Sequence, residues 1–161
     1  MNLLKVVSID PGVTTGLAIH EVHEGGVNPE WLMSELGPDK HHKTLWDFFT
    51  SVLPDVIVCE RFDYQNVTHM GAEMPGIRLE SREYIGICEL YTQMFSTCTL
   101  AMSPRTNKGK KAFFSPDKLK ALGLYRAPSG RQHMNDATAH LLHYVVFTLG
   151  RKDYLTPLRP S

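Results

Sequence analysis

The chain has 161 residues, of which 42% are hydrophobic and 21% charged, and its 17 basic side chains balance its 17 acidic ones. This length suits one compact domain with its own core, and the composition excludes a disordered, collagen-like or coiled-coil chain. Taken alone, the formal net charge of zero argues against a strongly basic nucleic-acid-binding protein.

The first half of the chain is predicted to be rich in strands. Short apolar or β-rich runs predict strands at residues 4–9, 16–20, 31–36 and 55–60. Asp10-Pro11-Gly12 has the composition of a turn between the first two strands. Apolar side chains at spacings of three and four predict a helix over residues 40–53, and Pro54 ends it.

Helices dominate the second half. The polar residues 63–76 are expected to form a loop, and residues 98–102 a fifth strand. The spacing of apolar residues predicts helices over residues 79–95, 116–122 and 132–149. Ser115 is the expected cap of the middle helix. Three early strands followed by alternating strands and helices predict a mixed α/β sheet covered by helices.

Residues 1–152 are expected to form a single domain, and residues 153–161 a C-terminal tail. No apolar run approaches the ~20 residues of a membrane helix, and the first residues lack a signal-peptide pattern. Cys59, Cys88 and Cys98 are odd in number and form no C-x-x-C motif, which favours buried reduced thiols over a zinc site. We therefore expect a cytoplasmic protein without a membrane partner.

The basic residues are unevenly distributed. Residues 105–131, called the basic segment below, contain eight basic side chains and a single acid, Asp117. The rest of the chain has nine basic and sixteen acidic side chains, so it carries an equal surplus of negative charge. Such a segment is either a solvated lysine-rich loop or a surface that binds an anionic partner.

Two acids and a short helical motif stand out. Asp10 ends the first predicted strand and Glu60 the fourth, and a carboxylate at the end of an apolar strand is costly unless paired or bound to a metal. If the two strands are neighbours, these side chains lie at one edge of the sheet, roughly 5 Å apart. His133 and Asp136 are three positions apart at the start of the last helix, so they share one face.

A helix packed across that edge would complete a cluster of three carboxylates and one imidazole. Crowded like charges demand a cation, and oxygen-rich ligand sets suit Mg²⁺ or Mn²⁺. Two such ions can activate a water and stabilise the leaving oxygen in phosphodiester cleavage. Each residue alone has a simpler explanation: Asp10 as a turn former, Glu60 as an ion-pair partner of Arg61, and Asp136 as a first-turn acid favoured by the helix dipole.

Three stretches resemble, in order and spacing, the motifs of RuvC-type Holliday-junction resolvases. Residues 8–18 (Ser-Ile-Asp-Pro-Gly-Val-Thr-Thr-Gly-Leu-Ala) resemble the first motif, and residues 56–60 (Val-Ile-Val-Cys-Glu) the second. Residues 133–137 (His-Met-Asn-Asp-Ala) are similar to the last motif. The small size and residues 119–125 (Leu-Lys-Ala-Leu-Gly-Leu-Tyr) resemble the bacteriophage branch of that family.

This resemblance implies an RNase H-like fold: a five-stranded sheet in the order 3-2-1-4-5, with strand 2 antiparallel, flanked by helices. It implies cleavage of branched DNA with Mg²⁺ or Mn²⁺, two ions per site, held by Asp10, Glu60, His133 and Asp136. It also implies a homodimer, because two symmetric nicks need two active sites. In this family the second helix, here residues 79–95, builds the dimer, although its aromatic face could equally be core.

The chain departs from the commoner family pattern at two places. His133 stands where many members have an aspartate, so it would be either a neutral metal ligand or a general base. The loop of residues 63–78 is unlike that of typical members. Family members place a junction-opening aromatic after the second-motif glutamate, and Phe62 and Tyr64 are candidates for it here.

The basic segment leads directly into His133, so its side chains would flank the metal site and contact DNA phosphates. The predicted contacts are Arg105, Lys108, Lys110, Lys111, Lys118, Lys120, Arg126 and Arg131. Three aromatic residues among them could stack on unpaired bases: Phe113, Phe114 and Tyr125.

Three other functions fit part of the pattern. Residues 10–16 also resemble the first phosphate loop of the sugar kinase and actin-like ATPases, but those need two such domains, so no nucleotide cofactor is expected. A non-catalytic RNase H-like module that binds nucleic acid is disfavoured, since it has no need of clustered acids facing phosphate. A nuclease of the same fold that cuts flaps, forks or RNA–DNA hybrids is not separated from a resolvase by the sequence.

Overall fold

A computed structural model describes residues 3–37, 42–61, 80–104, 112–126 and 132–157. Its centre is a five-stranded sheet in the order β3-β2-β1-β4-β5. The strands are β1 (Leu3–Asp10), β2 (Thr15–His23), β3 (Trp31–Leu36), β4 (Val56–Glu60) and β5 (Thr99–Ser103). β2 is antiparallel to β1 and β3, whereas β4 is parallel to β1 and β5. The expected sheet order and the antiparallel second strand are confirmed.

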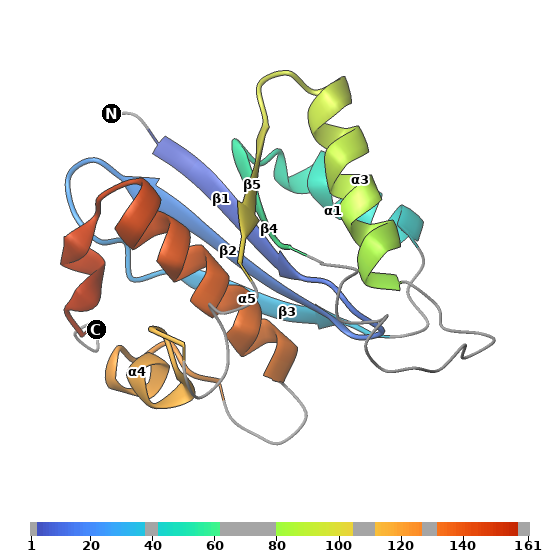
Figure 1. The fold of residues 1–161 in the computed structure, drawn as a ribbon. Coiled ribbons are helices and arrows are strands. Elements are labelled where there is room, and N and C mark those ends of the chain that lie inside the picture. Colours follow the sequence, from blue (N-terminus) through green and yellow to red (C-terminus); the bar gives the residue numbers. More distant parts are fainter. Residues whose placement is uncertain (1–2, 38–41, 62–79, 105–111, 127–131, 158–161) are drawn as a thin grey trace.

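Helices cover both faces of this sheet (Figure 1). On one side lie α1 (His42–Val52) and α3 (Glu80–Met94), and on the other α4 (Pro116–Ala121) and α5 (Gln132–His143). The last predicted helix is in fact two, because the π-helix η2 (Tyr144–Thr148) continues α5. The predicted cap of α4 is confirmed: the backbone N–H of Lys118 donates to Ser115 Oγ at 3.4 Å.

The alternation of side chains along the strands divides the core into two layers. Val6, Val56 and Val58 pack in the layer of α5, whereas Val7 and Ile57 pack in the layer of α1 and α3. Since successive side chains point to opposite faces, the later even-numbered positions of β1 and β4 also face α5. The last such positions on these two strands are residues 10 and 60.

The α3 helix shows which of its faces is core. Tyr84, Cys88 and Tyr91 are buried against the sheet and α1, as a core face requires. Leu90 and Met94 are apolar residues that this helix leaves exposed. The aromatic face of the helix that the resemblance assigns to a dimer is therefore used inside this chain.

The end of the described chain packs on the sheet. After η2 comes the 3-10 helix η3 (Lys152–Leu155), whose Tyr154 is buried in the α5 layer. Residues 152–155 therefore pack on the body of the fold, although the sequence suggests a tail from residue 153. The rest of the predicted division between domain and tail stays a prediction. Among the described residues, no helix is long and apolar enough to cross a membrane.

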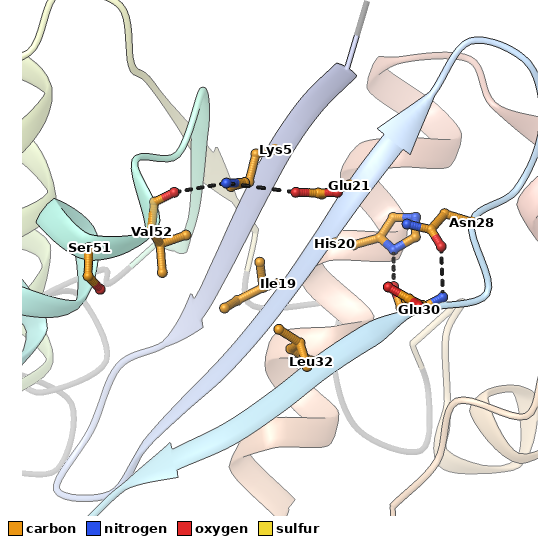
Figure 2. Close-up of a pocket in the computed structure, with 9 residues that line it drawn as sticks. All are labelled: Lys5, Ile19, His20, Glu21, Asn28, Glu30, Leu32, Ser51 and Val52. Atoms are coloured by element: carbon orange, nitrogen blue, oxygen red, sulfur yellow. Dashed lines mark hydrogen bonds and ion pairs between the residues drawn. The ribbon is translucent and has the colours of Figure 1, made fainter.

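The amino end of β1 borders a cavity of about 270 Å³ (Figure 2). Lys5 lines it and donates from Nζ to the backbone oxygen of Val52 at 3.1 Å, with Glu21 Oε1 3.7 Å away. Lys5 is five positions from Asp10 on the same strand, or roughly 16 Å along it. This cavity is therefore separate from the carboxyl end of β1, where the predicted site residues lie.

Candidate active site

Asp10 and Glu60 lie side by side at the carboxyl edge of the sheet. β1 and β4 are neighbours, with Ile9 opposite Cys59, so both strands end together at the next residue. The two carboxylates face α5 and are 1% and 6% exposed. The sequence-based prediction that these strands are adjacent and bring the two acids together is confirmed.

The start of α5 lies directly against β2, and Gly16 makes this possible. A Cβ at this position would stand 1.9 Å from the backbone oxygen of His133 and 2.7 Å from the nitrogen of Met134. No side chain fits in that space, so the glycine that opens the second strand permits the close approach of the helix. Glu35 on the neighbouring β3 accepts a hydrogen bond from the backbone N–H of Met134 through Oε1 at 3.2 Å. The first turn of α5 is thus fixed over the edge that holds Asp10.

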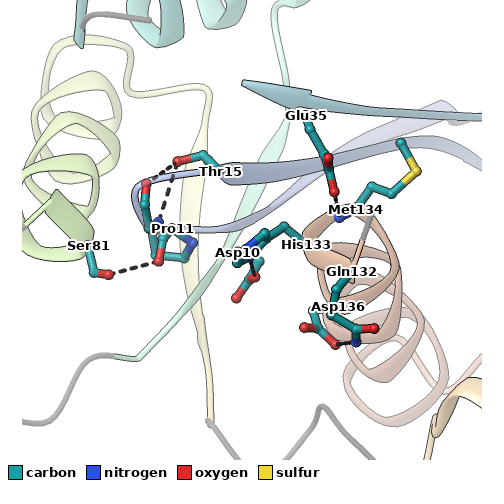
Figure 3. A network of polar contacts seen from close by, with 10 residues as sticks. Asp10, Pro11, Thr15, Glu35, Ser81, Gln132, His133, Met134 and Asp136 are labelled. Carbon is teal, nitrogen blue, oxygen red and sulfur yellow. Dashed lines mark hydrogen bonds and ion pairs between the residues drawn. The ribbon is translucent and has the colours of Figure 1, made fainter. Parts of the chain in front are cut away.

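His133 and Asp136 lie on this first part of α5 but have different partners (Figure 3). His133 Nδ1 donates to Asp10 Oδ2 at 2.8 Å, which links the helix to the end of β1. Asp136 is buried and its Oδ1 accepts from Gln132 Nε2 at 2.9 Å. The structure thus brings His133 onto Asp10, whereas the contact shown for Asp136 is with its own helix.

A further histidine completes the cluster at the edge, and the sequence analysis did not select it. His140 is 0% exposed. One of its ring nitrogens and one oxygen each of Asp10 and Glu60 all lie within 4.8 Å of one another. Among the described residues, His133 and Asp136 do not join a group this compact. The helical spacing could have revealed the third position, because residues 133, 136 and 140 share one face.

The β5 strand supports this histidine. Ser103 ends β5 opposite Glu60, and its Oγ is 2.8 Å from His140 Nδ1. Both side chains are buried. The hydrogen bond restrains rotation of the imidazole ring relative to the sheet.

The electrostatics of this cluster call for a positive charge. Two buried carboxylates this close repel each other, and burying each one costs several kcal/mol unless compensated. Their field reaches the opposite face of the sheet. There the pKa of Cys59 is raised well above its ordinary value by a hydrogen bond with Cys88, by burial and by the charges of Glu60 and Asp10. The predicted buried, unpaired cysteines are confirmed.

The turn that follows Asp10 is fixed by two contacts. Thr15 Oγ1 donates to the backbone oxygen of Gly12 at 3.0 Å. Ser81 at the start of α3 donates to the backbone oxygen of Pro11 at 2.8 Å (Figure 3). The Asp-Pro-Gly sequence is thus anchored from both of its sides, which limits the positions that the Asp10 carboxylate can adopt.

Arg126 of the basic segment is tied to α5. The side chain of Asn135, itself buried, accepts from the backbone N–H of Arg126 at 2.9 Å and donates to its carbonyl oxygen at 3.0 Å. Arg126 is exposed beside the first turns of the helix. Lys118 and Lys120 belong to α4, where Lys120 Nζ lies 3.4 Å from Asp117 and over the Tyr125 ring.

The remaining predicted DNA contacts lie outside the described residues: Arg105, Lys108, Lys110, Lys111 and Arg131. The same holds for Phe62 and Tyr64, the candidate junction-opening aromatics. Of the aromatic residues in the basic segment, Phe113 is exposed, but Phe114 is buried in the core. The prediction that Phe114 could stack on bases is wrong, because its ring packs in the α5 layer of the core together with Leu119 of α4.

No protein-family model matches the chain, and no curated protein sequence matches it. Its structure, however, is similar to solved Holliday-junction resolvases. The RuvC of T. thermophilus in complex with a Holliday junction substrate has a TM-score of 0.55 and 16% identity, covering 92% of this chain and 97% of that one. The Fowlpox virus resolvase with substrate Holliday junction DNA has a TM-score of 0.60 and 12% identity, covering 91% and 99%. The chain has the RNase H-like fold of these resolvases, and the predicted fold class is confirmed.

Proposed function

We propose that this protein is a metal-dependent endonuclease that cuts phosphodiester bonds in branched DNA, with the four-way junction as its substrate. The observation that carries the proposal is the buried pair of Asp10 and Glu60, which closes the carboxyl edge of a sheet that junction resolvases share. Buried like charges are tolerated where a cation neutralises them. A divalent cation at such a site can activate the water that hydrolyses a phosphodiester bond.

The residues present fit Mg²⁺ or Mn²⁺. Carboxylate oxygens are the ligands that both ions prefer, and a neutral imidazole is compatible with the second. Asp10 and Glu60 would hold the metal, with His133 and Asp136 beside them. A bound divalent ion would supply an activated water and stabilise the leaving oxygen, and two ions per site would serve both tasks.

The neighbouring side chains have roles of their own in this proposal. His133 orients the Asp10 carboxylate through its 2.8 Å hydrogen bond, and Gln132 holds Asp136 in the same way. A neutral His133 would be able to accept a proton from an attacking water as a general base. Gly16 and Glu35 keep the whole helix at the distance that these contacts need.

The basic segment would bind the DNA backbone. Arg126 is held beside α5 by Asn135, and α4 carries Lys118 and Lys120 on the same side of the sheet. Contacts of such side chains with phosphates supply affinity that is independent of sequence and weakens with salt. The proposal extends to the other basic side chains of the segment, and to Phe62 or Tyr64 as the residue that opens the junction.

We further propose that two copies act together, because paired nicks across a junction need two active sites. Since the aromatic face of α3 is used in the core, a dimer through this helix would use its exposed residues, such as Leu90 and Met94. Sedimentation tests this directly, and a monomer at all concentrations would contradict it. The protein would act in the cytoplasm of a bacterium or of a phage-infected cell, where recombining DNA is found.

Cleavage of a synthetic four-way junction tests the proposed function. Linear duplex, a flap, a fork and an RNA–DNA hybrid of matched sequence would be run beside it, each with Mg²⁺, Mn²⁺ or EDTA. We expect paired symmetric nicks in the junction with metal only, and no hydrolysis of ATP. Preferential cutting of the flap, fork or hybrid would show that this structure, and not the four-way junction, is the substrate. Binding without cutting of any of them would indicate a non-catalytic module.

A further inference from the structure

His140 is placed where a metal ligand would be, and neither the sequence motifs nor the fold comparisons assign it a role. It projects from α5 two turns after His133, on the layer that faces Asp10 and Glu60. A ring nitrogen lies within 4.8 Å of an oxygen of each carboxylate, and all three side chains are buried.

Ser103 contacts one of the two ring nitrogens of His140. Ser103 Oγ lies 2.8 Å from Nδ1 of the buried ring. Ligating histidines commonly place the second ring nitrogen on a hydrogen-bond acceptor, which fixes the tautomer and the orientation of the ring. In the tautomer in which Nδ1–H donates to the Ser103 hydroxyl, Nε2 carries the lone pair and would be the nitrogen that binds a metal.

We propose that His140 is a ligand of the same divalent cation as Asp10 and Glu60, and that Ser103 is its positioning residue. This rests on the proposed function in so far as that function requires a cation at the carboxyl edge. Imidazole is a softer ligand than carboxylate or water, so this ligand biases the site towards Mn²⁺ over Mg²⁺. The three protein ligands then come from three elements: β1, β4 and α5.

The test uses the full-length protein loaded with Mn²⁺ alone and measures nitrogen hyperfine coupling by pulsed electron paramagnetic resonance. We expect a coupling in the wild type that changes when histidine alone is labelled with ¹⁵N. His133→Gln should retain this coupling and His140→Gln should lose it, while His143→Gln on the same helix is the matched control. Calorimetry on the same samples gives the Mn²⁺ affinity, which should fall by about 10- to 100-fold in Ser103→Ala. The preference for Mn²⁺ over Mg²⁺ should shrink in His140→Gln.

The outcomes separate the two proposals. A His140→Gln protein that binds Mn²⁺ with the nitrogen coupling unchanged would overturn the role of His140 and leave the metal-dependent nuclease intact. A wild type that binds Mn²⁺ without any histidine coupling would do the same. A wild type that binds no Mn²⁺ would overturn both. Circular dichroism establishes that each variant is folded, and if His140→Gln is not, the coupling in Ser103→Ala and His133→Gln decides.

Discussion

Two buried histidines, His20 on β2 and His140 on α5, show what separates a structural polar group from a candidate metal ligand. His20 on β2 is 1% exposed, and both of its nitrogens have neutral partners: Nδ1 donates to the backbone oxygen of Glu30 at 2.9 Å, and Nε2 lies 2.8 Å from the Tyr154 hydroxyl. Its ring stacks on Trp31 with centroids 4.0 Å apart. His140 is equally buried, but two carboxylates lie beside it.

Burial alone therefore does not identify a functional histidine in this fold. The pKa of His20 is lowered to about 4, mainly because burial disfavours its charged form. A ring of this kind is neutral at physiological pH and cross-links β2 with η3. At the carboxyl edge, in contrast, the two carboxylates beside His140 carry negative charge, and a bound cation would neutralise it. The buried histidine near η3 therefore has a structural role, whereas the one at the carboxyl edge lies in the proposed metal site.

The largest effect on cleavage is expected from removing one carboxylate at the carboxyl edge of the sheet. Asp10→Asn keeps the size of the side chain but withdraws a proposed metal ligand, and Glu60→Gln does the same from β4. Each should reduce junction cleavage more than about 100-fold, beyond the loss typical of residues that only support a ligand. Gel assays of nicked products measure this, and gel-shift assays should still show junction binding. Cleavage by Asp10→Asn near the wild-type rate would refute the metal-site mechanism.

The next effect concerns Gly16, because it permits the first turn of α5 to lie against β2. Gly16→Ala places a Cβ inside the backbone of His133, so the helix must shift, and we expect the free energy of unfolding to fall by about 3 kcal/mol. Cleavage should fall as well, since the helix carries three of the candidate site residues. Gly86→Ala on the exposed side of α3 meets no atom within 4 Å and is the control. If chemical denaturation gives equal stabilities for the two variants, the close approach of α5 is not needed.

The contribution of His20 to stability is expected to depend on pH. The pKa of His20 is about 4 in the folded chain and near its ordinary value of 6.5 when unfolded, so the unfolded chain binds more protons between these values. The stability that this group contributes is complete above pH 6.5 and is lost as the pH falls to 4. The loss amounts to about 3 kcal/mol.

Denaturation of wild type and His20→Gln across this pH range measures the contribution of His20, because other titrating groups cancel in the difference. The gap between the two stability curves should narrow towards pH 4. Curves that stay parallel from pH 7 to pH 4 would show that the ring of His20 is not held neutral by the fold.

The smallest effect is expected from the hydroxyl that His20 contacts. Tyr154→Phe removes one hydrogen bond and leaves a buried ring nitrogen without this partner, at a cost of about 1–3 kcal/mol. The specific activity of the folded fraction should not change, since Tyr154 lies far along the sheet from Asp10. Thermal unfolding and junction cleavage on the same preparation measure both. Loss of cleavage without loss of stability would contradict the purely structural role of Tyr154 and His20.

Strand-end acids were the part of the site that could be predicted. Asp10 and Glu60 each close an apolar strand, and their pairing follows once those strands are adjacent. Helical spacing places His140 on the face of His133 and Asp136, but its contact with Ser103 depends on the register of β4 with β5. Only the folded sheet brings these together.

The burial of residues in the outer part of the fold was harder to predict from the sequence. Tyr154 belongs to a stretch that the sequence suggests is a tail, yet its ring is buried because His20 and Trp31 offer it a hydrogen bond and an aromatic surface. These partners are more than a hundred positions earlier in the chain. Phe113 and Phe114 look alike in sequence, and only the packing of α4 decides which one is buried.

Direct measurement of Mn²⁺ binding by calorimetry tests the central claim, which is that the carboxyl edge of the sheet holds a divalent cation. The wild type and Tyr154→Phe are expected to bind Mn²⁺ with the same affinity, and Asp10→Asn is expected to bind it more than about 100-fold more weakly. Equal binding by all three proteins, or none by the wild type, would contradict the claim.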